Sequence, residues 1–406
     1  MRLLIPVLFL LSFAAFASEG FVEEQIYNHY KTGLHKNSLK NRQILPITPF
    51  EQKLYVDSIE DSLIEGTITS DLISNFSTTT FKIVERFRLE LIKLQYKESN
   101  AIAPDVLSEL LNELQKPEVE TRLIYIIAVH EKLILESGAS EIIDLAKKNE
   151  AYREIDRETE TEGELLAEMI SDLYFNTPDV TTYMEGEYLK SVRIFMFCRQ
   201  NRLYPCLMVM KDSKGEPVLR EDGTLWTNGA LASAVTGLPS YERNGNTPAG
   251  IFTIDSVMPY ADQQVSYGKF RRMMLNFVPK SQDEVLLKSL LPKSSWGGDW
   301  WKVSTVARDI GRNLFRIHGS GKLNTDPNTP YFPFMRTHGC ISQRENTYNG
   351  VTYKDQRNLL DSILKAMDIT PKFENEPKIK GILYIVEIED KSEAVSLADL
   401  KSFGIE

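Results

Sequence analysis

The stretch TPDVTTYMEGEYLKS, residues 177–191, separates two parts of the chain with different hydrophobic patterns. Before it, apolar residues recur at helical spacing, as in FKIVERFRLELIKLQ, residues 81–95. After it come short runs rich in β-forming residues, the first being VRIFMF, residues 192–197, separated by clusters of Gly, Pro, Asn and Asp. Helical pieces such as KDQRNLLDSILKAM, residues 354–367, interrupt these runs. The change of pattern predicts an all-α domain followed by a mainly β domain with inserted helices.

The length and composition of the chain agree with two folded domains. Its 406 residues exceed one ordinary domain, and 42% hydrophobic and 26% charged residues are typical of globular proteins. We expect a helical accessory domain over residues 18–185, a β-rich domain over residues 190–390, and a C-terminal tail or helix over residues 391–406. Residues 18–185 hold 32 acidic and 17 basic residues, against 25 and 29 in residues 186–406. This division argues against nucleic acid as a partner and leaves a protein partner open for the helical domain.

The amino terminus has the layout of a cleaved secretory signal. Arg2 precedes an apolar run from Leu3 to Phe16, and small residues surround Phe16 before the chain turns polar at Ser18. The run is shorter than the ~20 apolar residues that a membrane-spanning helix needs. We therefore expect a signal peptide over residues 1–17, a periplasmic or otherwise extracytoplasmic protein, and no stable membrane insertion.

The chain has three cysteines, an odd number for an exported protein. Cys198 and Cys206 flank a turn-like Gln200-Asn201-Arg202, so a hairpin could bring them together. Connectivity cannot be deduced from sequence, and a disulfide and two free thiols both stay open. If the disulfide forms, Cys340 is the remaining thiol.

Cys340 lies in MRTHGCISQREN, residues 335–346, where catalysis, metal binding and an inert thiol are alternatives. A thiol attacks a carbonyl as thiolate and needs a nearby base or positive charge. Two of the five histidines, His318 and His338, lie close in sequence, and Gly339 permits a tight turn that aims amides at an oxyanion. As zinc ligands, the two histidines and Cys340 lack a fourth partner nearby. The polar neighbours fit a buried inert cysteine poorly, so the sequence predicts acyl transfer with no metal and no cofactor.

These residues also resemble a known family. His318, a gap of eighteen residues, and then THGCI, residues 337–341, are similar to the signature of the L,D-transpeptidase catalytic domain. A second element, NTPAGIFTI, residues 246–254, resembles the Thr-Pro-x-Gly-x-Phe stretch that those domains carry before a core strand. The resemblance covers roughly residues 190–390. It implies a β-rich, sandwich-like catalytic domain that acts on peptidoglycan stem peptides.

The resemblance also implies catalytic roles. Cys340 would attack the third-position diamino acid of a stem tetrapeptide and expel D-alanine, and the thioester would pass to an amine or to water. With an amine as acceptor, the enzyme would be a transferase that builds the cell wall. With water as acceptor, it would be a hydrolase, an L,D-carboxypeptidase. His318 would be the general base and acid, oriented through the backbone carbonyl of Gly319. His338 would shape the pocket, and amides at Gly339 and Cys340 would form the oxyanion hole.

The chain departs from the family pattern at the expected substrate-binding residues. Where the family usually has Arg or Asn, two residues after the cysteine, this chain has Ser342. Recognition of a substrate carboxylate would then move to Arg344 or Arg336, beside Thr337, although each arginine equally fits an ordinary surface position. A degenerate, non-catalytic wall-binding or scaffold protein is the alternative, against which the intact Cys340 and His318 argue.

Residues 280–313, which contain the tryptophan-rich stretch SSWGGDWWKVSTVARD, look like an insertion before His318. The tryptophans of this stretch, Trp300 among them, would form a lid or a sugar-stacking platform, or alternatively a small satellite core. The sequence leaves both interpretations open.

Overall fold

The structure, a computed structural model, describes residues 48–64, 81–153, 167–178, 191–258, 264–278, 284–298 and 300–406. The expected signal peptide, residues 1–17, lies outside these residues. Contacts divide the chain into two compact units, one of Met1–Arg157 with Asp309–Gly311 and one of Glu158–Arg308 with Arg312–Glu406. A helical region followed by a sheet-rich region is therefore confirmed.

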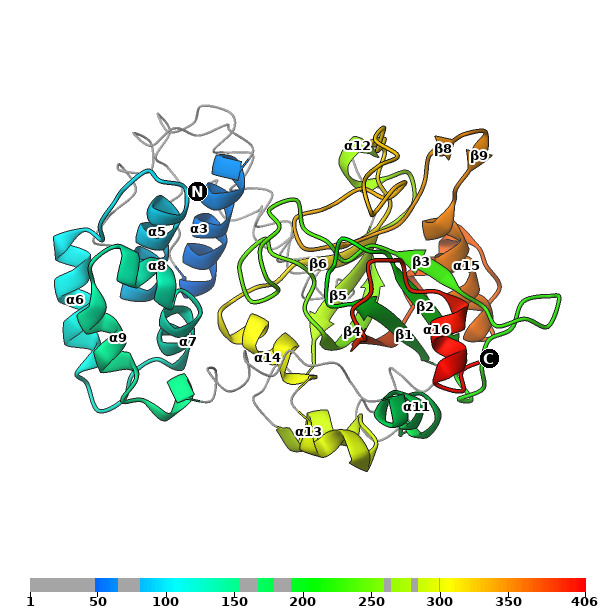
Figure 1. Ribbon diagram of the computed structural model, residues 1–406, viewed down its shortest axis with the longest axis horizontal. Helices are drawn as coiled ribbons and strands as arrows, with labels where there is room; N and C mark the ends of the chain where they lie inside the picture. Colours follow the sequence, from blue (N-terminus) through cyan, green and yellow to red (C-terminus); the bar gives the residue numbers. More distant parts are fainter. Residues whose placement is uncertain are drawn as a thin grey trace, which may run out of the picture. The chain divides into compact units, whose positions relative to one another are not determined.

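The first unit is helical over its described residues (Figure 1). Helix α6 illustrates why these residues form helices. It begins at Pro104, whose missing N–H would have no partner in the first turn anyway, and it buries every fourth residue, Val106, Leu110 and Leu114. The helices are α3 (Pro49–Ile64), α5 (Ile83–Gln95), α6 (Pro104–Leu114), α7 (Thr121–Val129), α8 (Glu131–Glu136) and α9 (Ser140–Ala146).

Helix α11 (Ala167–Asn176) belongs to the second unit, although we expected a helical domain extending to residue 185. Its Ile170, Leu173 and Tyr174 are buried in the core of the second unit, where the Tyr174 ring packs edge-on against Phe195 with centroids 5.1 Å apart. The contacts thus divide the chain earlier than expected. An amphipathic pattern predicts a helix with one buried face but does not say which core buries it.

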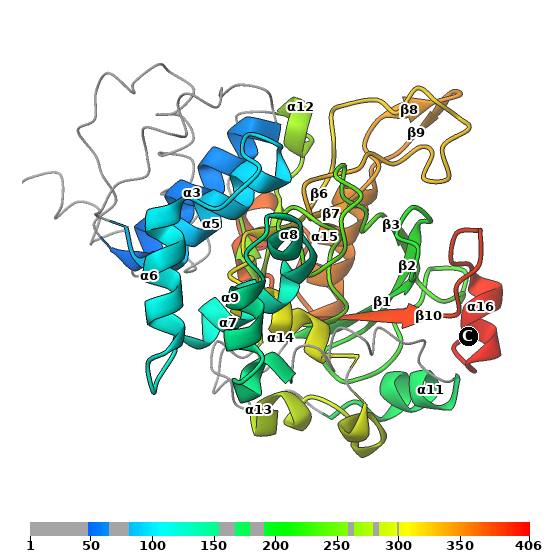
Figure 2. The same cartoon turned by 60° about the vertical axis from the view of Figure 1, so that its left-hand side comes forward.

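The second unit contains one mixed sheet of eight strands among the described residues (Figure 2). The spatial order is β3-β2-β1-β10-β4-β5-β6-β7, with β1 parallel to β10, β6 parallel to β7, and the other neighbours antiparallel. The strands are β1 (Val192–Arg199), β2 (Cys206–Lys211), β3 (Asn228–Ala230), β4 (Gly250–Val257), β5 (Met273–Phe277), β6 (Phe315–His318), β7 (Ile341–Ser342) and β10 (Gly381–Ile388), with a separate hairpin of β8 (Thr347–Tyr348) and β9 (Val351–Thr352).

The two ends of this sheet approach each other. Leu231, one residue beyond β3, exchanges both backbone hydrogen bonds with Ser342 of β7, at 3.0 and 2.9 Å. The eight strands of this sheet therefore form one continuous sheet whose edges meet, and the expected two-layer sandwich is not confirmed in that detail.

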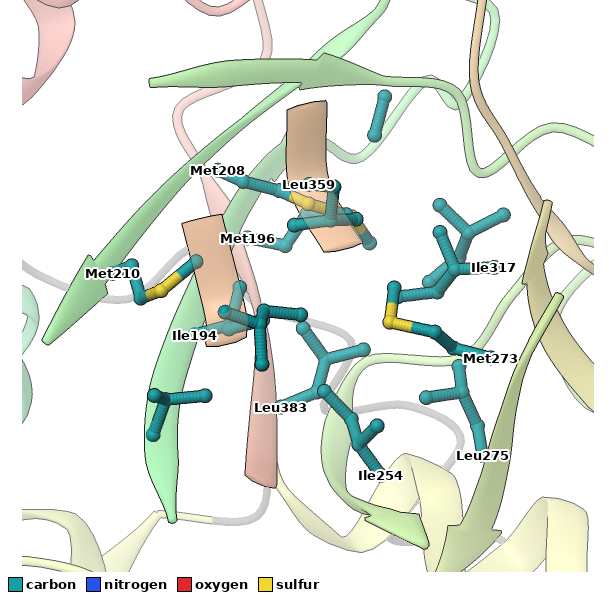
Figure 3. Close-up of a cluster of buried hydrophobic side chains, with 14 of the residues drawn as sticks. Ile194, Met196, Met208, Met210, Ile254, Met273, Leu275, Ile317, Leu359 and Leu383 are labelled. Atoms are coloured by element: carbon teal, nitrogen blue, oxygen red, sulfur yellow. The ribbon is translucent and has the colours of Figure 1, made fainter. Parts of the chain in front are cut away.

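Apolar side chains on one face of the sheet pack against α15 (Asp355–Ala366). Strand residues alternate between faces, so Ile194 and Met196 of β1 and Ile317 of β6 point to the same side as Leu359 of α15 (Figure 3). The remaining helical segments after residue 158 are α12 (Gln264–Tyr267), α13 (Glu284–Ser289), η3 (Lys293–Gly297), α14 (Lys302–Asp309), η4 (Phe373–Lys378) and α16 (Leu397–Ser402).

The opposite face carries a second core, which contains Trp300 and Trp301. Both are nearly fully buried beside Phe195 and Tyr384, and the Trp301 ring nitrogen donates to the carbonyl of Ser295 at 3.1 Å. The burial of Trp300 and Trp301 agrees with the core interpretation for these two tryptophans and leaves Trp300 no face for a substrate sugar, whereas Trp296 is 43% exposed.

The cysteines adopt one of the two arrangements that the sequence left open. Cys198 and Cys206 form a disulfide between β1 and β2, and Cys340 is free. Within the described part of the chain, no helix is long and apolar enough to cross a bilayer.

Candidate active site

The register of β6 and β7 brings Cys340 and His318 to one face of the sheet. The strands run parallel, with Ile317 beside Ile341 and His318 beside Ser342. Ile317 and Ile341 point into the core that α15 covers, so the alternate residues Arg316, His318 and Cys340 project from the opposite face. Two residues far apart in sequence are thereby placed on neighbouring strands.

Cys340 is partly buried beside a guanidinium that sequence reasoning missed. Its Sγ lies 4.0 Å from Nη1 of Arg316, and the thiol donates to the carbonyl of Leu314 at 3.8 Å. Arg316 is itself buried. A buried positive charge at this distance is placed to stabilise negative charge that develops on the sulfur when it acts as a nucleophile. The available sequence signal was a charged residue inside the apolar run that ends at His318.

His318 is held as a neutral base. Its Nδ1 lies 2.6 Å from the carbonyl oxygen of Gly319, and because a carbonyl only accepts, Nδ1 carries the proton and Nε2 is left to accept one. Burial, assisted by the charges of Arg316 and Arg272, lowers the pKa of His318 to about 4. The ring of Tyr267 packs edge-on against the imidazole with centroids 5.3 Å apart.

The turn before Cys340 requires glycine at position 339. Gly339 has φ +106°, and a Cβ there would lie 2.7 Å from Nη2 of Arg312 and 3.0 Å from the carbonyl oxygen of Gly245. The hydroxyl of Thr247 donates to the carbonyl of Gly339 at 2.9 Å. The two sequence elements that resemble a known family are therefore in direct contact.

Arg312 holds the loop before β4 against this turn. Its guanidinium donates to the carbonyls of Gly245 at 2.9 Å and Asn246 at 2.8 Å, and also to that of Ser240. The arginine stacks over the ring of Phe315 with 4.7 Å between the guanidinium carbon and the ring centroid. The nucleophile turn is thus braced by buried polar contacts. The same contacts join the regions around Thr247 and Cys340, which lie far apart in the sequence.

Residues 211–349 match the family model YkuD, the L,D-transpeptidase catalytic domain. The match includes both elements that carry the resemblance, which is thereby confirmed, and leaves out the helical unit. No curated protein and no solved structure matches the chain.

The expected substrate-binding residues are mostly engaged in internal contacts. Ser342 is fully buried, and its hydroxyl donates to the carbonyl of Met335 at 2.6 Å. Arg344 pairs with Asp355 at 2.5 Å, and Arg336 donates to the carbonyl of Ala234 at 2.8 Å. Ser342 is therefore closed to a ligand in this structure, whereas both arginines are partly exposed and their role in substrate binding stays a prediction.

Thr337 and His338 differ in placement. The Thr337 hydroxyl is buried and donates to the carbonyl of Cys340 at 2.6 Å, so it fixes the turn instead of facing a ligand. The His338 side chain is exposed, on the outside of the same turn. Among the described residues, no group of three or more His, Cys, Asp or Glu side chains is placed to hold a metal ion.

Proposed function

We propose that the protein is an exported cysteine L,D-transpeptidase that acts on peptidoglycan stem peptides. The observation that carries the proposal is a free Cys340 and a neutral His318 on one sheet face, within a segment that matches the L,D-transpeptidase catalytic domain. Arg316 supplies the positive charge that a thiolate needs.

In the first half-reaction, His318 Nε2 takes the thiol proton and the Cys340 sulfur attacks the carbonyl carbon of the third-position diamino acid. The oxyanion that forms is stabilised by backbone amides at Gly339 and Cys340. When it collapses, the bond to D-alanine breaks, the leaving amine takes the proton from His318, and a thioester remains on Cys340.

In the second half-reaction, an amine of a second stem peptide attacks the thioester carbonyl and gives its proton to His318. Collapse forms the new amide and releases the Cys340 sulfur, which recovers the proton. The product is a 3-3 cross-link, which would serve wall biogenesis and cell shape. With water in place of the amine, the same acyl-enzyme yields a tripeptide, which is the L,D-carboxypeptidase alternative.

Acylation by a carbapenem separates an enzyme from a non-catalytic wall-binding scaffold. We expect one carbapenem per chain by intact-protein mass spectrometry, and none in Cys340→Ala. A Ser342→Ala variant is the matched control, because its hydroxyl is buried and faces the carbonyl of Met335. An unmodified wild-type protein under reducing conditions would reject the enzyme proposal.

The fate of the acyl group is decided by incubating the protein with purified wall fragments rich in tetrapeptides. Mass analysis is expected to show dimers joined between two third-position residues. Tripeptides without such dimers would replace transpeptidation by carboxypeptidation, with the same first half-reaction.

Export to the periplasm or beyond the cytoplasm belongs to the same proposal. The signal-like segment and the Cys198–Cys206 disulfide both suit an oxidising compartment. Fractionation of cells followed by sequencing of the mature amino terminus tests it, and a cytoplasmic protein that still begins at Met1 would contradict it. The helical unit is proposed to contact a protein partner, since the family match does not extend to it.

A further inference from the structure

A buried carboxylate that no step above uses lies next to the catalytic histidine. Glu345 follows β7 by three residues and is only 6% exposed. Its carboxyl group is wedged between two glycines: a Cβ on Gly319 would lie 2.0 Å from Oε1, and a Cβ on Gly268 would lie 2.4 Å from Oε2. Because both of these positions are glycine, there is room for the carboxyl group between them.

The two oxygens of Glu345 are treated differently. Oε2 accepts from the backbone N–H of Lys269 at 2.6 Å, and the N–H of Phe270 also donates to this carboxyl group. Oε1 is buried and has no hydrogen-bond partner among the residues that the structure describes. A buried carboxylate oxygen without a partner is costly, and such a group is retained where its charge acts on a neighbour.

That neighbour is the His318 turn. Gly319 contacts the carboxyl group through its Cα and accepts from His318 Nδ1 through its carbonyl. The charged groups that act on the imidazole are Arg316 on its own strand, Arg272 at the start of β5, and Glu345. Glu345 is the negative member of this set, whereas both arginines oppose a positive charge on the ring.

We infer that Glu345 is a positioning residue for His318. It holds the Gly319 turn that orients the imidazole, and its charge stabilises the imidazolium that forms each time His318 takes a proton. The catalytic consequence rests on the proposed function, whereas the coupling between the two side chains does not.

The balance of charges supports this pairing. Burial raises the pKa of the Glu345 carboxyl group, and the N–H groups of Lys269 and Phe270 together with His318 oppose that rise. In return, Glu345 raises the pKa of His318 against the effect of burial. The coupling is reciprocal, so protonation of His318 strengthens ionisation of Glu345.

The test compares charge with shape at position 345. Glu345→Gln keeps the acceptor for Lys269 and loses the charge, whereas Glu345→Asp keeps the charge and shortens the side chain. We expect Glu345→Gln to titrate His318 at lower pH than the wild type, by NMR of labelled histidine with His318→Gln for assignment. We also expect carbapenem acylation to slow about tenfold, which corresponds to one pKa unit, with unchanged KM and melting temperature. Glu345→Asp is expected to recover part of the rate.

Glu374→Gln, an exposed glutamate on η4, is the matched control and is expected to leave the titration and acylation unchanged. A His318 titration and an acylation rate that are both unchanged in Glu345→Gln would overturn the inference. If the wild type is not acylated at all, the proposed function fails, and the His318 titration alone still decides whether Glu345 is coupled to it.

Discussion

At the scale of single residues, the contact between Arg316 and Cys340 places a positive charge beside the sulfur atom. The guanidinium is buried 4.0 Å from the sulfur, where a charge is weakly screened. We expect Arg316→Ala to slow carbapenem acylation about tenfold or more, and Arg316→Lys to restore part of the rate. Stopped-flow or mass-resolved kinetics measure this. The exposed Arg220→Ala serves as the control, and equal rates in Arg316→Ala and wild type would remove Arg316 from the mechanism.

The buried His318 also makes the stability of the second unit depend on pH. Its pKa is about 4 in the folded protein against 6.5 for the free side chain, so between these values the unfolded chain binds a proton that the folded chain does not. The contribution of His318 to the free energy of unfolding is therefore fully present above pH 6.5 and decreases as the pH falls toward 4. Its total loss is about 3 kcal/mol.

All four tryptophans lie between residues 226 and 301, so tryptophan fluorescence during urea unfolding reports the second unit alone. We expect the midpoint to fall less on acidification in His318→Gln than in the wild type. His338→Gln, at an exposed position, is expected to behave as the wild type does. The same acid sensitivity in His318→Gln and wild type would show that other groups control it.

The sequence alone was sufficient to identify residues whose role depends on a short local motif. Cys340, His318 and Gly339 were identified because the motif is short and its chemistry is specific. Arg316 was missed because its position beside the sulfur depends on the parallel register of β6 and β7, which pairs residues more than twenty positions apart. Glu345 was missed for a similar reason, since its approach to His318 depends on contacts with Gly319, Gly268 and the N–H of Lys269 that local spacing does not reveal.

At the scale of elements, the site depends on a turn that precedes β7. The backbone of Gly339 combines a positive φ with close contacts to Arg312 and Gly245, so alanine there meets both strain and overlap. We expect Gly339→Ala to abolish carbapenem acylation and to lower the urea midpoint of the second unit.

Gly350 separates the two causes, because it shares a positive φ of 80° but has open space where a Cβ would stand. Gly350→Ala is expected to cost about 1 kcal/mol from backbone strain and to retain acylation. If Gly339→Ala behaved like Gly350→Ala in both measurements, the close contacts with Arg312 would have no role in shaping the nucleophile turn.

The same scale explains the departures at Ser342 and Trp300. Ser342 departs from the family pattern, and its side chain is buried because the backbone bridges to Leu231 and the hydroxyl donates to the carbonyl of Met335. A tryptophan-rich segment looks alike in sequence whether its rings face solvent or a core. The burial of Trp300 in the cluster that contains Phe195 and Tyr384 shows that it belongs to the core.

At the scale of the whole molecule, the division of the chain follows helix α11. The ring of Tyr174 packs on Phe195, which in turn stacks on Tyr384 with centroids 4.9 Å apart, and Lys211 donates to the carbonyl of Tyr174 at 3.1 Å. Sequence pattern assigned α11 to the helical domain, but these contacts make it part of the sheet-bearing unit.

Two truncated chains test this assignment. We expect residues 158–406 to unfold cooperatively and to keep Cys340 reactive toward a carbapenem, because every contact of α11 with the sheet is retained. Residues 186–406 lack α11 and expose Phe195, and losing three fully buried apolar side chains at about 1.5–3 kcal/mol each is expected to remove most of the stability of a typical domain. Tryptophan fluorescence during urea unfolding compares the two chains. Equal midpoints would mean that α11 covers the sheet without stabilising it. The domain that folds independently would then begin near residue 185.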